Sequence, residues 1–340
     1  MYLSTKASFL IGSLRRPSSY LIPMKVLINN LDAAYKRRAP LLGVTEAFRI
    51  VNGAPDGFPG LTLDKFGDRY QIQFFGDELL REKNAVVAAV AEKFAPLCLV
   101  VKERLSRSGK SLENPPMEVA VGRAEDSVGV VREGSAKFHI DLLDTVNPGL
   151  FLDMRHIRLE MGERAADRRM LNLFSYTCAF SVHGRLGGAE ISTNADISAK
   201  ILDKGRENYA LNGLEPKQGE FFRGNAVEYV HWAQKKGLKF DSIVLDPPSF
   251  ARFKGKNFNV REHLMPLVAD CATLLNKGGL FMVSSNYSGF NLSAFSRNAL
   301  ASVASVHPKA KTLWSKSQDI DFVGSGHTKD SCLVATLIEV

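Results

Sequence analysis

The sequence predicts an α/β protein of two domains, in which the second domain carries a mostly parallel sheet. Three observations lead to this prediction. The length of 340 residues is sufficient for two domains. From Met170 onward, short apolar runs alternate with helical stretches, a pattern typical of parallel strands covered by helices. The last 30 residues instead contain two strand-like runs without a helical pattern between them, which favours an antiparallel hairpin at one edge of the sheet.

The first domain is expected at residues 48–140, as a small α+β unit. Its apolar runs are short and are separated by turn residues such as those at 56–60. Leu80, Val86, Val90 and Phe94 recur at helical spacing. The expected elements are strands over 61–63, 70–75, 98–102 and 127–131, a helix over 78–94, and a basic loop over 104–116.

The second domain is expected at residues 141–340. It begins with a connector in which Asp153 is positioned to cap a helix that starts at Met154. The seven expected strands are the short apolar runs, and the helices are the amphipathic stretches between them. The strands are predicted over 170–174, 189–195, 219–222, 242–245, 280–284, 311–315 and 332–340, and helices over 198–212, 226–236 and 261–275.

Residues 1–47 are predicted to be a basic N-terminal segment. The net charge is +8, and most of this excess lies within the first 49 residues. The segment has two interpretations, an arm that contacts nucleic-acid phosphates or a solvated tail. Residues 1–31 contain no acidic side chain, which is also typical of an organellar targeting segment. We expect a cytoplasmic protein, and this acid-free segment makes an organellar location the alternative.

The cysteines and the apolar runs exclude several classes of protein. Cys98, Cys178, Cys271 and Cys332 are far apart, so neither a zinc site nor a disulfide framework is expected. A reducing compartment fits this usage. Because no stretch of about 18 uncharged apolar residues is present, we expect no membrane span.

Candidate binding residues follow the first three strands of the second domain. Ligands of open parallel sheets bind at the carboxyl ends of the strands. The first strand leads into a loop of small and hydroxyl residues at 172–180. Asp196 follows the second strand, where a carboxylate accepts ribose hydroxyls, although it could instead cap the next helix. Asn225 follows the third strand, and its amide could hydrogen-bond an adenine edge.

The fourth strand ends in the sequence D-P-P-S-F at 246–250, which is the most specific local signal. Two consecutive prolines fix the backbone and remove two donors, so their carbonyl groups form a rigid platform for a flat base. Phe250 could stack on that base. A nicotinamide dinucleotide is disfavoured, because the first loop lacks the G-x-G-x-x-G pattern.

These motifs together resemble a known family, the bacterial large-subunit ribosomal RNA methyltransferases that join a small α+β domain to a Rossmann-like class I catalytic domain. The resemblance covers residues 48–340 and rests on the segments at 149–155, 172–180 and 246–250. It implies S-adenosylmethionine as the cofactor. It also implies 23S-type rRNA or the assembling large ribosomal subunit as the partner, without a metal or a membrane. Cys178 departs from the family pattern, which has glycine at that position.

The resemblance implies a role for each candidate residue. Asp246 and Pro247 would hold the target base, with Phe250 and Asn286 beside it. Arg155 would pair with the cofactor carboxylate or an RNA phosphate, the alternative being a surface salt bridge. The expected cofactor-binding set is Phe174, Ser175, Tyr176, Thr177, Asp196, Ile197, Asn225, Ala226, Asp246 and Arg155. As basic residues, Lys102, Arg104, Arg107, Lys110, Arg252, Lys254 and Lys256 are candidate phosphate contacts, with solvated loop charge as the alternative for each.

The residues after the fifth strand bear on which atom is methylated. Methylation of cytosine C5 requires a cysteine thiolate that attacks C6, and residues 281–288 contain no cysteine. Guanine N7 offers a lone pair and needs only alignment. The chain is most similar to the guanine-N7 half of a bifunctional 23S rRNA methyltransferase, so guanine N7 is the expected target. The alternatives are cytosine C5, an exocyclic amine, or an inactive RNA-binding assembly factor.

Overall fold

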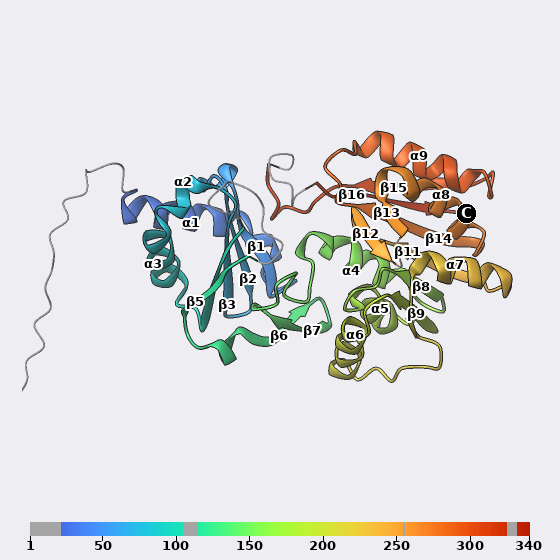
Figure 1. Ribbon diagram of the computed structural model, residues 1–340, viewed down its shortest axis with the longest axis horizontal. Helices are drawn as coiled ribbons and strands as arrows, with labels where there is room; N and C mark the ends of the chain where they lie inside the picture. Colours follow the sequence, from blue (N-terminus) through green and yellow to red (C-terminus); the bar gives the residue numbers. More distant parts are fainter. Residues whose placement is uncertain (1–21, 105–114, 254–255, 325–331) are drawn as a thin grey trace, which may run out of the picture.

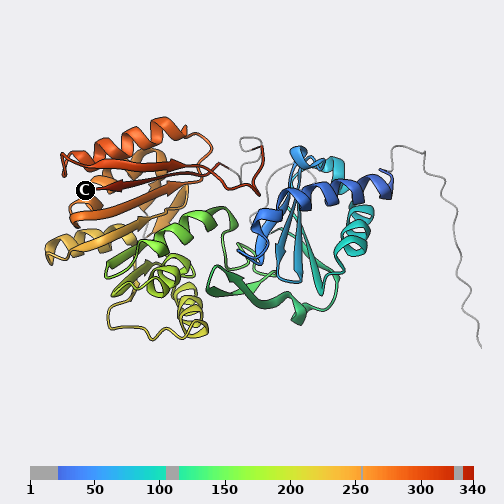
Figure 2. The ribbon, with the colours of Figure 1, turned by 180° about the vertical axis from the view of Figure 1, so that it is seen from behind.

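The computed structural model describes residues 22–104, 115–253, 256–324 and 332–340. These residues form two domains that lie side by side, with the smaller domain nearer the N-terminus (Figure 1). In the view from behind, the described residues 317–324, in dark red, extend from the larger domain toward the smaller one (Figure 2). Among the described residues, no helix combines the length and the apolar character that crossing a bilayer requires. The expected cytoplasmic location stays a prediction.

The small domain is a five-stranded sheet in the order β1-β2-β3-β4-β5, in which only β3 and β4 pair in parallel. Helices α1 and α3 pack against each other and bury the apolar side chains of the sheet. The strands are β1 (Ala47–Asn52), β2 (Leu61–Phe66), β3 (Arg69–Phe74), β4 (Cys98–Glu103) and β5 (Met117–Val121), and the helices are α1 (Met24–Arg37), α2 (Asp77–Leu80) and α3 (Lys83–Phe94).

Helix α1 differs from the expectation of a basic segment up to residue 47. Leu27, Leu31 and Ala34 are buried, and their spacing places them on one face of the helix. They join the core of the small domain, so this domain begins before residue 48. Of the basic residues that suggested an arm or a tail, Lys25, Lys36 and Arg37 are exposed on the helix, whereas Arg38 and Arg49 are buried and pair with Asp56 and Asp64. The others lie in residues 1–21, outside the described residues.

A separate hairpin lies between the two domains. Its strands are β6 (Val128–Glu133) and β7 (Ala136–Asp141). Phe138 of this hairpin shares one apolar cluster with Phe66 of the small domain and Val182 of the catalytic domain. The two domains therefore pack through a common core rather than through a flexible linker.

The second domain contains the predicted seven-stranded sheet, in the order β10-β9-β8-β11-β14-β16-β15. All its neighbouring strands pair in parallel except those that pair with β16, which is antiparallel to β14 and β15. The fold class predicted from the sequence is confirmed. The strands are β8 (Arg169–Leu173), β9 (Ile191–Asp196), β10 (Phe221–Arg223), β11 (Phe240–Leu245), β14 (Leu275–Ser285), β15 (Lys311–Lys316) and β16 (Val334–Glu339).

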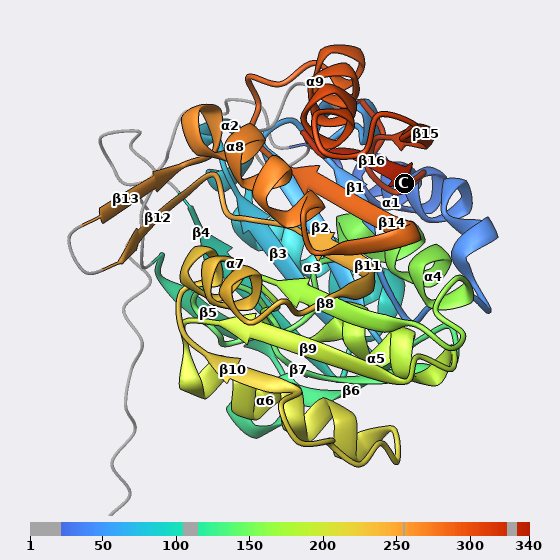
Figure 3. The same ribbon diagram turned by 90° about the vertical axis from the view of Figure 1, so that its right-hand side faces the viewer.

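Helices cover both faces of this sheet (Figure 3). Helices α4, α5 and α6 lie together on one face, and α7, α8 and α9 lie on the other. Their bounds are α4 (Arg155–Glu163), α5 (Ala179–Leu186), α6 (Ala199–Leu211), α7 (Ala226–Lys235), α8 (Val260–Ala272) and α9 (Leu292–Ala304).

Three local features differ from the sequence expectations. The helix expected over 78–94 is interrupted between α2 and α3. Helix α4 starts at Arg155, and the side chain of Asp153 does not cap it. The chain after the two prolines forms an additional hairpin, β12 (Phe250–Phe253) with β13 (Lys256–Asn259), which the sequence pattern did not indicate.

Candidate active site

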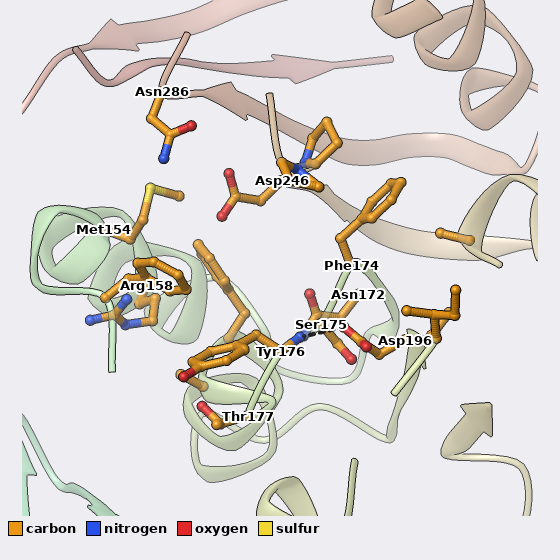
Figure 4. Close-up of a pocket in the computed structure, with 18 of the residues that line it drawn as sticks. Met154, Arg158, Asn172, Phe174, Ser175, Tyr176, Thr177, Asp196, Asp246 and Asn286 are labelled. Carbon is orange, nitrogen blue, oxygen red and sulfur yellow. Dashed lines mark hydrogen bonds between the residues drawn. The ribbon is translucent and has the colours of Figure 1, made fainter. Parts of the chain in front are cut away.

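A cavity of about 420 Å³ opens at the carboxyl ends of β8, β9, β10 and β11. This is the position at which open parallel sheets bind ligands. Figure 4 shows that the labelled side chains converge on the cavity from the strand ends and from helix α4. The lining includes Phe174, Ser175, Tyr176, Thr177, Asp196, Ile197, Asn225, Ala226, Asp246, Pro247 and Asn286. The structure thus brings together most of the residues that the sequence singled out.

The loop after β8 has an unusual backbone. Phe174, Tyr176 and Cys178 have positive φ angles of 58°, 47° and 63°, a region that costs about 1–2 kcal/mol for an ordinary L-residue. The turn is held in place, because the backbone N–H of Ser175 donates to Ala195 at 3.2 Å and the Thr177 hydroxyl donates to the Gly149 carbonyl at 2.7 Å. Backbone strain of this kind concentrates at ligand sites. No sequence pattern indicated this backbone strain apart from the small residues of the loop.

Asp196 lies at the end of β9 and faces the cavity. Its two carboxylate oxygens accept the backbone N–H groups of Tyr176 at 3.1 Å and of Ser198 at 2.9 Å. Burial raises the pKa of Asp196 despite these two donors. Each oxygen keeps a lone pair, so the carboxylate can accept two hydroxyl groups as well. The helix cap that was the alternative role belongs to Ser198.

Asn225 caps helix α7 and lines the same cavity. Its side-chain oxygen accepts the N–H groups of Val227 at 2.8 Å and Glu228 at 3.3 Å. The amide nitrogen is therefore the part of this side chain that can donate to a ligand. Ile197 and Ala226 add apolar surface beside it.

The D-P-P segment forms the opposite wall of the cavity. Asp246 accepts a hydrogen bond from the Ser284 hydroxyl at 2.7 Å, and burial raises the pKa of Asp246. The Ser249 hydroxyl donates to the side-chain oxygen of Asn286 at 3.4 Å. The prediction for Phe250 differs from the structure, because its side chain is 59% exposed and is not among the residues that line the cavity. The chain turns outward there into the β12–β13 hairpin.

Helix α4 and the residues before it supply part of the lining that the sequence did not predict. Asp153 and Arg158 both face the cavity. Burial, and then the nearby Asp246 carboxylate, raise the pKa of Asp153 to about 6. Arg158 donates two hydrogen bonds to Glu133, at 2.8 and 2.7 Å. Burial alone would raise the pKa of Glu133, but Arg158 and His183 outweigh it and bring this pKa to about 2.

Two basic residues have roles other than those predicted. Arg155 is not a cofactor ligand, because its guanidinium is 1% exposed and pairs with Asp319 and Asp321 instead of facing the cavity. Lys102 is not a surface phosphate contact, because it is buried and donates to the carbonyls of Asp144 and Thr145 at 3.0 and 3.1 Å. Burial lowers the pKa of Lys102 to about 8.

The remaining candidate phosphate contacts have different outcomes. Arg104 lies at the boundary of the two domains and donates to Gln73 at 2.9 Å. The other candidates lie outside the described residues or have side chains outside them, namely Arg107, Lys110, Arg252, Lys254 and Lys256.

A second cavity, of about 400 Å³, lies between the two domains and adjoins the first. The two cavities share the lining residues Phe151, Asp153, Ser249 and Asn286. One wall consists of polar side chains from β1, β2 and β3 of the small domain. No local sequence pattern indicates this cavity, because its walls come from segments that are distant in the chain.

The donor and acceptor groups of the first cavity fit a nucleoside-bearing cofactor. Asp196 offers acceptors to a ribose, Asn225 a donor to a base edge, and Phe174 an apolar surface. The strained loop brings the hydroxyl-bearing residues Ser175 and Thr177 to the same wall. A family model described as S-adenosylmethionine-dependent methyltransferase matches residues 104–307. The chain belongs to this family.

Comparisons with named proteins agree with this assignment. Ribosomal RNA large subunit methyltransferase K of Neisseria meningitidis serogroup B is 33% identical over 258 residues, which are 73% of this chain and 71% of that protein. Ribosomal RNA large subunit methyltransferase I of Klebsiella pneumoniae is 30% identical over 243 residues, or 71% of this chain. The chain spans only 60% of the length of this second relative.

A solved structure supports the fold. The crystal structure of SMU.776 in complex with SAH has a TM-score of 0.83 and 24% sequence identity, and the match covers 95% of this chain and 83% of that one. The protein is thus an S-adenosylmethionine-dependent methyltransferase with the class I fold. S-adenosylmethionine supplies an electrophilic methyl group when it is bound. Asp196 would hold its ribose, Asn225 its adenine, and Ser175 to Thr177 its methionine end.

Among the described residues, no group of three or more histidine, cysteine or acidic side chains is arranged to hold a metal ion. The four cysteines are not among the residues that line the two cavities. Cys98, Cys178 and Cys271 are buried. Burial raises the pKa of both Cys178 and Cys271.

Proposed function

We propose that this methyltransferase transfers a methyl group to guanine N7 of a 23S-type ribosomal RNA, as free RNA or within the assembling large subunit. The substrate class is supported by the names of the relatives from Neisseria meningitidis and Klebsiella pneumoniae, both of which are ribosomal RNA large subunit methyltransferases. The observation that carries the choice of N7 is the position of the cysteines, which lie outside both cavities.

Transfer to N7 needs no covalent intermediate. The N7 lone pair attacks the methyl carbon, and the bond from that carbon to sulfur breaks with its electron pair remaining on sulfur. The guanine base becomes a cation, which no base needs to deprotonate. Asp246 and Asp153 would stabilise this developing positive charge, because both carboxylates line the first cavity.

Cytosine C5 is the second candidate target, because the names of the relatives do not state which base is methylated. This reaction requires a thiolate beside the target carbon. Cys332 is the least buried of the four cysteines, but it is not among the residues that line either cavity. A variant in which all four cysteines are replaced by serine should therefore keep its transfer activity.

The decisive experiment incubates the protein with methyl-labelled S-adenosylmethionine and unmodified large-subunit rRNA. The labelled nucleoside is then identified by mass spectrometry. We expect 7-methylguanosine from both the wild-type protein and the cysteine-free variant. Labelled 5-methylcytidine would reject the N7 proposal and leave the substrate class intact. Tight RNA binding without transfer to free rRNA or to assembling subunits would instead favour an inactive assembly factor.

A further inference from the structure

The cavity between the domains contains polar groups whose hydrogen-bonding capacity is not fully used. The amide of Gln73 accepts a hydrogen bond from Arg104 at 2.9 Å and donates to Asp64 at 3.5 Å. This leaves one N–H group and one lone pair of the amide. Gln73 is only 7% exposed, and buried polar groups are normally satisfied. Unused capacity at such a position indicates a ligand.

The opposite wall offers complementary groups. Asp153 is 9% exposed and forms no hydrogen bond to another residue within the described part of the chain. The side-chain oxygen of Asn286 accepts from Ser249, so its amide nitrogen can still donate. Both residues belong also to the first cavity, which places them at the junction with the methyl donor.

The junction also contains an aromatic surface. Phe151 lines both cavities and is 37% exposed. Its ring lies 5.0 Å from that of Tyr176, and Tyr176 is fixed by hydrogen bonds to Asn147 and Asp196. Enzymes that modify a base in RNA or DNA stack it on such a ring and read its polar edge by hydrogen bonds.

The charged side chains that line this cavity are the guanidinium groups of Arg49 and Arg104 and the carboxylates of Asp64 and Asp153, so opposite charges balance. Arg49 is paired with Asp64 through hydrogen bonds of 2.7 and 3.0 Å, so its positive charge is neutralised. Asp153 adds a second carboxylate to the lining. A lining without net charge suits a neutral base, since a carboxylate accepts the N1–H and N2–H groups of guanine and the amides donate to its O6.

We propose that the cavity between the domains is the pocket for the target base, in which Gln73 of the small domain and Asp153 of the connector determine specificity by hydrogen bonding to its polar edge. This inference rests on the proposed function, since it names the recognition site for the same base. The small domain thereby takes part in the selection of the nucleotide at the reacting centre.

The test uses Gln73→Met, which keeps the side-chain volume and removes the amide. The matched control is Gln234→Met, which removes an amide that bonds Asp270 and Thr273 away from both cavities. We expect Gln73→Met to lower kcat/KM for rRNA at least tenfold, with an unchanged Kd for S-adenosylmethionine by calorimetry. If this variant fails to fold, Gln73→Glu is used in its place, because its carboxylate keeps the acceptor for Arg104 and lacks the amide N–H donors.

A binding measurement makes the inference independent of transfer. Guanosine, inosine and adenosine monophosphates are titrated into protein saturated with SAH, and binding is followed by NMR. We expect guanosine monophosphate to bind best, Gln73→Met to weaken it at least tenfold, and Asp153→Asn to remove the preference over inosine, which lacks N2. These results support the pocket even if rRNA is not the substrate. Wild-type binding or transfer in both variants would overturn it.

Discussion

The guanidinium of Arg155 holds the carboxylate of Asp321 with two hydrogen bonds, of 2.7 and 3.1 Å. The same carboxylate accepts the backbone N–H of Arg49 at 3.0 Å. Asp321 lies before the last strand, Arg155 begins α4, and Arg49 belongs to the small domain. This buried ion pair therefore joins three segments of the chain and fixes the position of the small domain against the catalytic domain.

Loss of Asp321 should be strongly destabilising, since it leaves the charge of Arg155 without its main partner in the interior. We expect Asp321→Asn to lower the free energy of unfolding by about 3–5 kcal/mol, measured by urea denaturation. Asp319→Asn is the control, because this second partner of Arg155 is 21% exposed and its loss should cost clearly less. Equal effects of the two substitutions would contradict the assignment.

The contact between Cys178 and Gly205 predicts that Gly205→Ala changes stability in opposite directions in the wild-type protein and in a Cys178→Gly variant. A Cβ atom at Gly205 would overlap the sulfur of Cys178. We expect Gly205→Ala to destabilise the wild-type protein by about 1–3 kcal/mol. In a Cys178→Gly background, the same change should stabilise helix α6 by about 0.5–1 kcal/mol. Thermal or urea unfolding of the four proteins gives the coupling, and additive effects would refute the contact.

Asp153 should make the stability depend on pH in a defined direction. Its pKa is raised to about 6 in the folded protein, so the native state binds a proton that the unfolded chain has lost. Stability from this group is present below the unfolded pKa near 4 and falls as the pH rises to 6. We therefore expect Asp153→Asn and the wild-type protein to unfold at similar urea concentrations near pH 4. At pH 7.5 the variant should be more stable than the wild-type protein by about 2–3 kcal/mol.

Asp144 provides a control of opposite sign for that experiment. Burial opposes ionisation, but the hydrogen bond from Lys204 holds the pKa of Asp144 below its usual range. Its contribution is present above the unfolded pKa and is lost as the pH falls through the folded one. Asp144→Asn should therefore be less stable than the wild-type protein at pH 7.5. A gain of stability in this variant would indicate a general effect of removing negative charge.

Asp196 should contribute to cofactor affinity without contributing to RNA binding. Asp196→Asn keeps an acceptor for the loop but loses the charge that strengthens the hydrogen bonds of the ribose hydroxyls. We expect the Kd for S-adenosylmethionine to rise about 10- to 100-fold, as for a hydrogen bond to a charged group of about 1.5–3 kcal/mol. Calorimetry measures this change, with Asp203→Asn on the exposed surface of α6 as the control. An unchanged Kd would remove Asp196 from the cofactor site.

The sheet of the catalytic domain was predictable because its strands alternate with helices, and this alternation leaves a parallel arrangement as the simple solution. The insertion of β16 between β14 and β15 was not predictable in the same way. The sequence indicates a hairpin but not which of its strands meets the parallel part. Helix α1 was missed because its lysine and arginine residues obscured the buried stripe of Leu27, Leu31 and Ala34.

The candidate site likewise contains positions that the sequence could predict and positions that it could not. Asp196, Asn225 and Asp246 follow strand ends, and the geometry of a parallel sheet brings such positions together. Arg155 and Arg158 are three residues apart on α4, and the sequence does not give the rotation of that helix. It therefore could not indicate that Arg158 faces the cavity. Gln73 comes from another domain, and no local pattern places it next to Asp153.

The segment that carries Asp321 has a consequence for how the protein forms during synthesis. Arg49 is translated 272 residues before the aspartate that accepts its backbone N–H. The small domain can fold as soon as it leaves the ribosome, but its docking must wait until nearly the whole chain has been made. Phe322, which lines the cavity between the domains, arrives with the same segment. A chain that ends before residue 319 would contain every strand-end residue of the cofactor site and yet would lack a completed cavity between its domains.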